Sequence, residues 1–302
     1  MNNVLISIII NCYNGEKFLR EAITSVVNQT IQDWEIIFWD NQSSDNSAKI
    51  IQSFKEKRIR YFYSQRHTTL GEARNLAIKK STGKFIAFLD CDDWLETTKL
   101  EKTIKKLKDD KVGLVYTNGY IYYENKKRKK KFYQWRQKEG RQYEHFISHY
   151  NLMIPSVMIK REALIGLEKW FNPNFSMIEE FDLFVRIAEK WDVAYIHEPL
   201  CFWRAHEKSL TWTKREKFEI ENIIFLENIE KNHKVTDHCI NHFKAKIAYH
   251  QFYNQWKIYN IKNKKIIFPY LFVDVRIIFI LLLSSFSLDI FKSILKTIGK
   301  EI

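Results

Sequence analysis

The sequence predicts an α/β fold, in which a mostly parallel sheet is flanked by helices and followed by a helical C-terminal extension. Over the first 120 residues, apolar runs rich in β-branched residues alternate with stretches whose apolar residues recur at helical spacing. Beyond residue 212 only helical patterns remain. Strands that alternate with helices join by right-handed crossovers into a parallel sheet covered on both faces.

The first half supplies the strands and helices in strict order. The first strand is expected at Val4–Ile10, where seven apolar or small residues follow one another. We expect further strands at Glu35–Trp39, Arg58–Tyr63, Phe85–Leu89 and Val112–Tyr116, and helices over Phe18–Val27, Ala48–Phe54, Gly71–Lys80 and Thr97–Lys108. Gly83 follows the third helix closely and is interpreted as its stop signal.

The second half is less regular. Six successive cations, Lys126–Lys131, repel one another and favour an exposed loop. Helical spacing returns at Leu183–Lys190 and again from Lys214 to Ile261, and an apolar stretch interrupted by single polar residues covers Ile266–Leu288.

Composition limits the class of protein. Lys and Arg number 49 against 36 Asp and Glu, so the formal net charge is 49 − 36 = +13, which favours anionic partners. The four cysteines are far apart in the sequence and form no CxxC pair, which argues against a disulfide framework or a structural zinc site. The N-terminus lacks the basic region and cleavage site of a signal peptide. We therefore expect a cytoplasmic protein.

Polar clusters follow three of the expected strands, at Asn11–Asn14, Asp40–Asp45 and Asp90–Asp93. In open α/β sheets, ligands bind beyond the carboxyl ends of the strands, so these clusters should converge on one crevice. Three acids in four residues, Asp90, Asp92 and Asp93, repel one another unless a cation is present, and Mg²⁺ or Mn²⁺ would relieve that repulsion. A solvated acidic loop that caps the next helix explains the same residues equally well.

Several segments together resemble the family 2 glycosyltransferases, inverting enzymes that use nucleoside diphosphate sugars and have the Rossmann-like GT-A fold. The resemblance rests on SIIINCYNGEKFLREAITSVVNQT, WEIIFWDNQSSDNSAKII and GEARNLAIKKSTGKFIAFLDCDDW, which occur in the family's order. It continues through Pro155–Glu162, Ile178–Leu183 and Phe202–His206 and covers about two-thirds of the chain. It implies a catalytic domain at 1–212, with a nucleotide-binding half (1–100) and an acceptor half (101–212), followed by the helical extension at 213–302.

The resemblance implies roles for residues around the nucleotide. Tyr13 is expected to pack on the base, and Asp40 with Asn41 to read a uracil ring. The family has a second acid at the position of Asn41, whose amide oxygen can accept the base N–H without charge. Arg74 takes the place of an arginine near the nucleotide, where it could bind phosphate or brace the acidic loop. Asp92 resembles the ribose-side carboxylate.

The resemblance also implies a metal and a base. Asp93, with Asp92, matches the ligands of an Mn²⁺ or Mg²⁺ ion. Arg204 and His206 match an Arg-x-His motif near the diphosphate, where His206 could reach the metal or a phosphate; a lone histidine is more often structural. The pair Glu179-Glu180 resembles the family's Glu-Asp motif, whose second acid is the catalytic base. Glu180 is therefore the expected base, with Glu179 and Asp182 as substitutes. Acids at the start of a helix also favour its dipole without any catalytic role.

The resemblance implies a hexose or N-acetylhexosamine donor, with UDP first, and a glycan or lipid-linked acceptor in cell-surface polysaccharide or lipooligosaccharide synthesis. The basic run at 126–131 suits either anionic headgroups or solvent. The uncharged run Ile277–Phe286 is too short to span a bilayer, and Ile290–Lys300 has the lysine and apolar stripes of a helix in the membrane plane. Attachment to the inner face of the plasma membrane is expected; packing on the catalytic domain or in a homodimer explains the apolar stripe as well.

Two other classes of function compete with this interpretation. The net charge alone suggests a nucleic-acid-binding protein without transferase activity, but the sequence carries no RNA- or DNA-binding motif, and unpaired carboxylates would repel phosphates. A nucleotidyltransferase on a related sheet would need a glycine-rich phosphate loop, which the sequence lacks. We expect no nucleic-acid partner.

Overall fold

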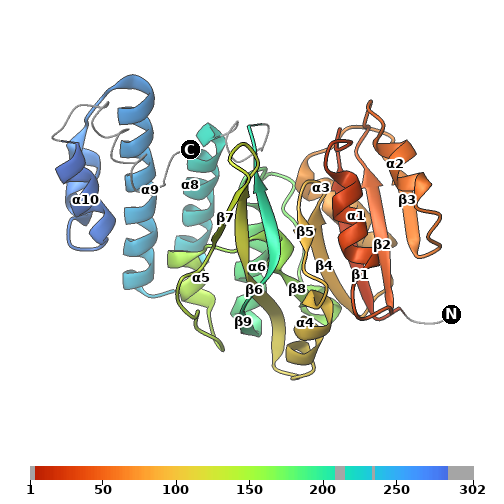
Figure 1. The fold of residues 1–302 in the computed structure, drawn as a ribbon. Helices are drawn as coiled ribbons and strands as arrows, with labels where there is room; N and C mark the ends of the chain where they lie inside the picture. The colour runs from red at the N-terminus through yellow and green to blue at the C-terminus, as the bar shows by residue number, and fades with distance from the viewer. Residues whose placement is uncertain (1–3, 208–214, 233–234, 285–302) are drawn as a thin grey trace. The chain divides into compact units, whose positions relative to one another are not determined.

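The computed structural model describes residues 4–207, 215–232 and 235–284 (Figure 1). The chain divides into two compact units, which are described separately. The first unit contains Met1–Phe146 and Tyr150–Lys214, and the second contains Ile147–His149 and Arg215–Ile302.

The first unit has the expected α/β fold. Its strands are β1 (Ile6–Cys12), β2 (Trp34–Asp40), β3 (Ile59–Tyr63), β4 (Phe85–Asp90), β5 (Trp94–Leu95), β6 (Val112–Tyr123), β7 (Arg128–Lys131), β8 (Met158–Lys160) and β9 (Asp192–Ala205). Its helices are α1 (Leu19–Val27), α2 (Ser47–Ser53), α3 (Leu70–Lys80), α4 (Lys99–Leu107), α5 (Tyr143–His149, whose last three residues belong to the second unit), η1 (Ile154–Ser156), η2 (Arg161–Leu164) and α6 (Glu179–Lys190). The predicted strands and helices are present, and most of their ends lie within two residues of the expected positions.

One sheet runs through this unit in the order β3-β2-β1-β4-β8-β6-β9-β5, and β7 pairs with β6. The pairs among β3, β2, β1 and β4 are all parallel. Antiparallel pairs occur only beyond β4, where β8 lies between β4 and β6, and at the outer partners β5 and β7. The first half of the sheet is therefore the parallel arrangement that the alternating pattern predicts.

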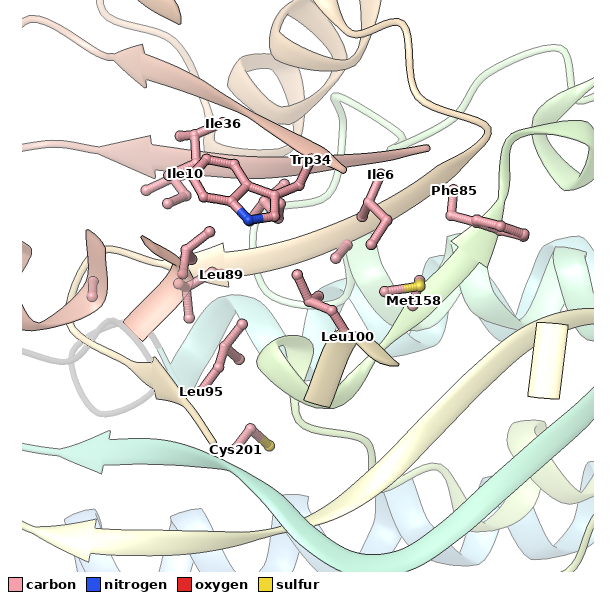
Figure 2. Packing of buried hydrophobic residues seen from close by; sticks show 14 of the residues in the cluster. Ile6, Ile10, Trp34, Ile36, Phe85, Leu89, Leu95, Leu100, Met158 and Cys201 are labelled. Atoms are coloured by element: carbon pink, nitrogen blue, oxygen red, sulfur yellow. The ribbon is translucent and has the colours of Figure 1, made fainter. Parts of the chain in front are cut away.

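Both faces of the parallel strands are covered, which explains their continuous apolar runs. On one face, Ile6, Ile8 and Ile10 pack with residues of α1 and α4 in a cluster that includes Trp34 and Leu100. Figure 2 shows Trp34, Ile10 and Ile36 gathered over β1 and β2, with Leu95 and Leu100 nearby. On the other face, Phe88 contacts Phe171 and Phe184, at ring-centroid distances of 5.5 and 6.1 Å. The sheet is thus fixed rigidly below its carboxyl edge.

The cationic run at 126–131 is not the loop that charge repulsion predicts. Its last four residues form β7, which pairs antiparallel with the tyrosine-rich end of β6. Lys129 Nζ lies 4.4 Å from the ring centroid of Tyr120 and 5.3 Å from that of Phe202. Long lysine stems can pack on aromatic rings while their charges remain in water, so an edge strand can tolerate this composition.

Gly83 does not end α3 as a left-handed cap. The helix ends at Ser81, whose backbone is extended. Gly83 instead lies against β1: its N–H donates to Ser7 Oγ at 2.8 Å. A Cβ atom on Gly83 would lie 2.5 Å from Ser7 N and 2.7 Å from the carbonyl carbon of Ile6. Glycine is needed here for the close approach of two backbones.

The second unit is helical over its described residues. It contains α8 (Arg215–Asn232), α9 (Asp237–Tyr259), η3 (Lys264–Ile266), η4 (Phe268–Tyr270) and α10 (Val275–Leu283). Phe252, Trp256, Ile277 and Ile280 are buried in one apolar cluster that joins α9 to α10. Among the described helices, none is both long enough and apolar enough to cross a bilayer. The stripes expected at Ile290–Lys300 lie outside the described residues.

Replacing Gly83 with alanine should destabilise the first unit, because the new methyl group would meet backbone atoms of β1 that cannot move alone. We expect a loss of about 1–3 kcal/mol in the free energy of unfolding, measured by urea denaturation. Lys84→Ala, at the exposed neighbouring position, is the control and should change stability by less than about 0.5 kcal/mol. Equal stabilities for the two variants would show that the close approach is not tight.

Candidate active site

The predicted polar clusters meet at one edge of the sheet. Register pairs Cys12 with Asp40, and Asn11 with Asp90, so the carboxyl ends of β1, β2 and β4 lie side by side. In the sheet, β2 and β3 lie on one side of β1, and β4 lies on the other side, so the strand order reverses at β1. This is a topological switch point, where open α/β sheets bind their ligands.

The three acids after β4 occupy different environments. Asp90 and Asp92 keep partial exposure, with side chains 31% and 29% exposed. Asp93 is 1% exposed; its Oδ1 accepts the Arg204 N–H at 2.8 Å, and its Oδ2 has no hydrogen-bond partner. Burial raises the pKa of Asp93 well above its ordinary value. Asp93 is therefore buried away from solvent, whereas Asp90, which Arg74 contacts, and Asp92 keep partial access to a ligand.

Arg204 is expected near the donor diphosphate, but its guanidinium is occupied by the protein. It donates to Glu21 and Glu124, and its Nε donates to the Asp92 carbonyl at 2.8 Å. The same group lies 4.3 and 4.4 Å from the ring centroids of Phe18 and Trp94. Arg204 thus fixes the loop that carries Asp92.

His206 lies directly beside Asp92, with 2.8 Å between His206 Nε2 and Asp92 Oδ2. One imidazole and one carboxylate suit Mn²⁺ or Mg²⁺ when substrate phosphates complete the coordination. Within the described residues, no group of three or more His, Cys, Asp and Glu side chains is arranged to hold a metal. Asp92 and His206 by themselves offer two ligand side chains, which fit an ion that the protein and a diphosphate ligand would share.

Arg74 is the centre of the second charged cluster. It projects from α3, is 2% exposed, and contacts Asp90 Oδ1 at 3.0 Å, Glu179 Oε1 at 3.1 Å and Glu180 Oε2 at 3.5 Å. These contacts join the end of β4 to the first turn of α6. The guanidinium therefore braces the acidic loop, the second of the two roles expected for it.

A single positive charge cannot fully neutralise three carboxylates. Burial raises the pKa of Glu180, Arg74 opposes the increase, and the charges of Glu179 and Asp90 add to it, so that the pKa lies at about 8. The Glu180 side chain is still 27% exposed, whereas that of Glu179 is 4% exposed. Glu180 is thus a carboxyl group with solvent access that ionises near neutral pH.

Asp182 faces a different partner. Its Oδ2 accepts hydrogen bonds from Arg186 Nη2 at 2.7 Å and Nε at 3.2 Å. Arg186 also donates to the carbonyls of Lys169 and Trp170. This pair fastens α6 to the preceding loop, so Asp182 is not part of the Arg74 cluster.

Asp40 and Asn41 are both buried and both bonded to protein. Asp40 accepts from the Ser43 N–H at 2.7 Å and from the Tyr61 hydroxyl at 2.8 Å. Asn41 Nδ2 donates to the Thr68 carbonyl at 2.9 Å, and its Oδ1 accepts from the Thr68 N–H and hydroxyl. Their side chains hold the loops around the expected base site.

The exposed groups at this corner are Tyr13 and His67. Tyr13 is 56% exposed, so it is not a core aromatic, and its ring centroid lies 4.5 Å from that of His67. His67 Nδ1 lies 2.9 Å from the Asn41 carbonyl, which can only accept, so Nδ1 carries the hydrogen. A neutral ring then has Nε2 as an acceptor. No sequence pattern indicates His67, because its position depends on its contacts with Tyr13 and Asn41, which lie in the loops after β1 and β2.

Comparisons with known proteins agree with this geometry. A family model described as "Glycosyl transferase family 2" matches residues 7–166. An uncharacterized glycosyltransferase from Methanocaldococcus jannaschii is 30% identical over 247 residues, 78% of this chain and 82% of that protein.

Escherichia coli WfgD, a UDP-Glc:alpha-D-GlcNAc-diphosphoundecaprenol beta-1,3-glucosyltransferase, is 36% identical over 125 residues. That match covers 41% of this chain and about half of WfgD (49%). Staphylococcus aureus TarS 1–349 in complex with UDP shares the fold, with a TM-score of 0.63 at 15% identity over 86% of this chain and 76% of that one.

Replacing Arg74 with methionine should leave buried carboxylates without a cation. We expect the free energy of unfolding at pH 7 to fall by about 3–5 kcal/mol. The loss should shrink as the pH falls from 7 toward 5, because protonation of Asp90, whose pKa is raised by burial, removes its unpaired charge. Glu180, with a pKa of about 8, is already mostly protonated at pH 7 and contributes little to this change.

Urea denaturation across this pH range measures the effect. Arg66→Met, which removes an exposed ion pair with Glu72, is the matched control and should cost less than about 1 kcal/mol. A loss in Arg74→Met that is small or independent of pH would contradict the assigned charge balance.

Proposed function

Since the chain belongs to glycosyltransferase family 2, we propose that it is an inverting, metal-dependent transferase of cell-surface polysaccharide or lipooligosaccharide synthesis. The proposed donor is a nucleoside diphosphate sugar, UDP-hexose or UDP-N-acetylhexosamine first. The observation that carries the proposal is the meeting of two charged groups at one sheet edge. Asp92 with His206 suits a diphosphate-bound cation, and Glu180 supplies a carboxylate with a raised pKa.

The nucleotide is proposed to bind beyond β1 and β2. Tyr13 offers an exposed ring against which a base can stack, and His67 Nε2 can accept the imino N–H of uracil. Asp40 and Asn41 act by holding the surrounding loops, since their side chains are bonded to protein. The uridine preference is supported by the UDP named with WfgD and TarS.

Asp92 and His206 are proposed to hold Mn²⁺ or Mg²⁺ together with the donor diphosphate. The bound ion would stabilise the negative charge that develops on the diphosphate leaving group. Asp93 and Arg204, expected as ligand and phosphate-binding residue, are proposed to keep the loop of Asp92 in place. A mannosyltransferase from Pyrobaculum calidifontis, solved with GDP-Man and Mn²⁺ and similar in fold, supports a metal.

Glu180 is the proposed base. Its carboxylate would take the proton of the acceptor hydroxyl while that oxygen attacks the anomeric carbon from the side opposite the diphosphate. One direct displacement inverts the configuration at that carbon. Arg74 and Glu179 are positioning residues that fix Glu180 at the start of α6.

The acceptor is proposed to be a glycan or a lipid-linked glycan at the cytoplasmic face of the plasma membrane, with the second unit as the helical extension of a catalytic domain at 1–212. The diphosphoundecaprenol in the name of WfgD supports this acceptor class.

The nucleic-acid alternative has no support beyond the net charge, and the acidic sheet edge opposes it. A homodimer stays a prediction.

Replacing Glu180 with glutamine should lower turnover by roughly 10²–10⁴-fold, because the amide cannot accept the acceptor proton. Donor affinity should change little, since Glu180 faces the acceptor side. In the wild type, kcat/KM should rise as the pH increases toward about 8, where Glu180 ionises. A coupled assay of UDP release, together with donor titration by calorimetry, measures both.

Asp182→Asn is the matched control in the same helical turn. It breaks the pair with Arg186 and should reduce stability more than turnover. Full activity in Glu180→Gln would refute the assignment of the base, and a large kcat loss in a stable Asp182→Asn would transfer the role to Asp182.

Donor and metal should stabilise the protein together. With free UDP and Mn²⁺ at about 100 times the dissociation constant, the free energy of unfolding should rise by about 2.7 kcal/mol. Asp92→Asn and His206→Ala should each abolish the part of this gain that depends on Mn²⁺, measured by thermal denaturation with and without the metal. Asp45→Asn, at an acid elsewhere on the same edge, should keep it. An Mn²⁺ effect that survives in Asp92→Asn would exclude Asp92 as a ligand.

A further inference from the structure

Helix α10 is apolar on two sides, but only one side is packed. Its sequence, VRIIFILLL, contains a single polar residue, Arg276. Ile277 and Ile280 are buried against residues of α9, beside which α10 lies in Figure 1. Val275, Phe279 and Leu282, spaced four and three residues apart on the opposite side, are 77%, 54% and 62% exposed. A helix with apolar residues all round normally has an apolar environment on every side.

The chain that enters α10 adds two exposed aromatic residues. Phe272 is 93% exposed and Phe268 is 55% exposed. With Val275, Phe279 and Leu282 they form a set of five large apolar side chains within fifteen residues, which we call the C-terminal apolar surface. Isolated exposed apolar residues are ordinary, but a group of this kind marks an interaction site.

The charged residues of the segment that carries this surface are almost all cations. Between residues 261 and 284 the cations are Lys262, Lys264, Lys265 and Arg276, and the only acid is Asp274, which gives 4 − 1 = +3. Asp274 is 8% exposed and is ion-paired with Arg276. In residues 261–284 the exposed apolar side chains are therefore accompanied by cations in the sequence, and the single acid of this segment is buried and paired.

We propose that the C-terminal apolar surface docks the protein onto an anionic lipid surface. Nine residues at 1.5 Å each make α10 about 14 Å long, half of the ~30 Å hydrocarbon core, so the helix lies in the interface and does not span it. Large apolar side chains beside lysines are the pattern of interfacial helices. A second copy of the chain fits less well, because lysine is depleted in the cores of protein interfaces.

This proposal rests on the proposed function, because that function requires an acceptor bound to the membrane. It assigns the attachment to described residues of α10 and the turn before it.

The test measures co-sedimentation of the full-length protein with two kinds of vesicle, phosphatidylcholine alone and phosphatidylcholine mixed with phosphatidylglycerol. The wild type should bind the anionic vesicles more tightly. Phe272→Ser/Phe279→Ser should weaken that binding at least about tenfold, because both rings are exposed in the free protein and would be buried in lipid. Lys264→Glu/Lys265→Glu should weaken binding to the anionic vesicles about tenfold or more.

Trp135→Ser is the matched control, since Trp135 is an 81% exposed aromatic of the first unit. It should leave vesicle binding unchanged. Donor hydrolysis without vesicles should be equal in all variants, which separates a failure of docking from a failure of the proposed transferase activity.

Three results would overturn the proposal. The first is absence of vesicle binding by the wild type, and the second is binding that the two phenylalanine substitutions leave intact. The third is a doubled mass in light scattering that Phe272→Ser/Phe279→Ser abolishes while no vesicle binding occurs, which would assign the surface to a second copy of the chain.

Discussion

The arrangement of the acidic sheet edge depends on one buried guanidinium that is shared by three carboxylates. Arg74 contacts Asp90 at the end of β4 and both Glu179 and Glu180 at the start of α6. Residues 105 and 106 positions away in the chain are thereby held at one point of the sheet edge. Burial and the charges of Glu179 and Asp90 outweigh the attraction of Arg74, so the pKa of Glu180 rises to about 8 and this carboxyl retains its proton near neutral pH.

The sheet edge carries two acidic groups, the carboxylates around Arg74 and Asp92 beside His206. They differ in how far positive charge compensates them. Glu180 contacts Arg74, but burial and the neighbouring carboxylates raise its pKa to about 8, which suits a general base. Asp92, beside His206, lies on a loop fixed by Arg204, and its side chain is 29% exposed at the place proposed for the ion and the donor diphosphate. The proposed transferase chemistry places a base and a leaving-group site in one crevice, and the two buried arginines, Arg74 and Arg204, hold their supporting loops.

The sequence was sufficient for the order of the fold and for which strand ends carry the site, because both follow from local periodicity and from the geometry of parallel sheets. The sequence was not sufficient to predict which groups the individual side chains contact. Whether Arg204 meets a phosphate or two glutamates, and whether Asn41 meets a base or Thr68, depends on loops that pack across the edge. His67 and the close approach of Gly83 to β1 depend on similar long-range contacts.

The charge balance around Arg74 can be tested by titrating the Glu180 carboxyl. The titration can be followed by ¹³C NMR of protein labelled at the glutamate side-chain carboxyls, with Glu180→Gln identifying the resonance. The account predicts a midpoint at about 8 in the unliganded protein. A midpoint near the ordinary glutamate value of about 4.3 would show that Arg74 and solvent stabilise all three carboxylates in their ionised form. That result would contradict the raised pKa of Glu180.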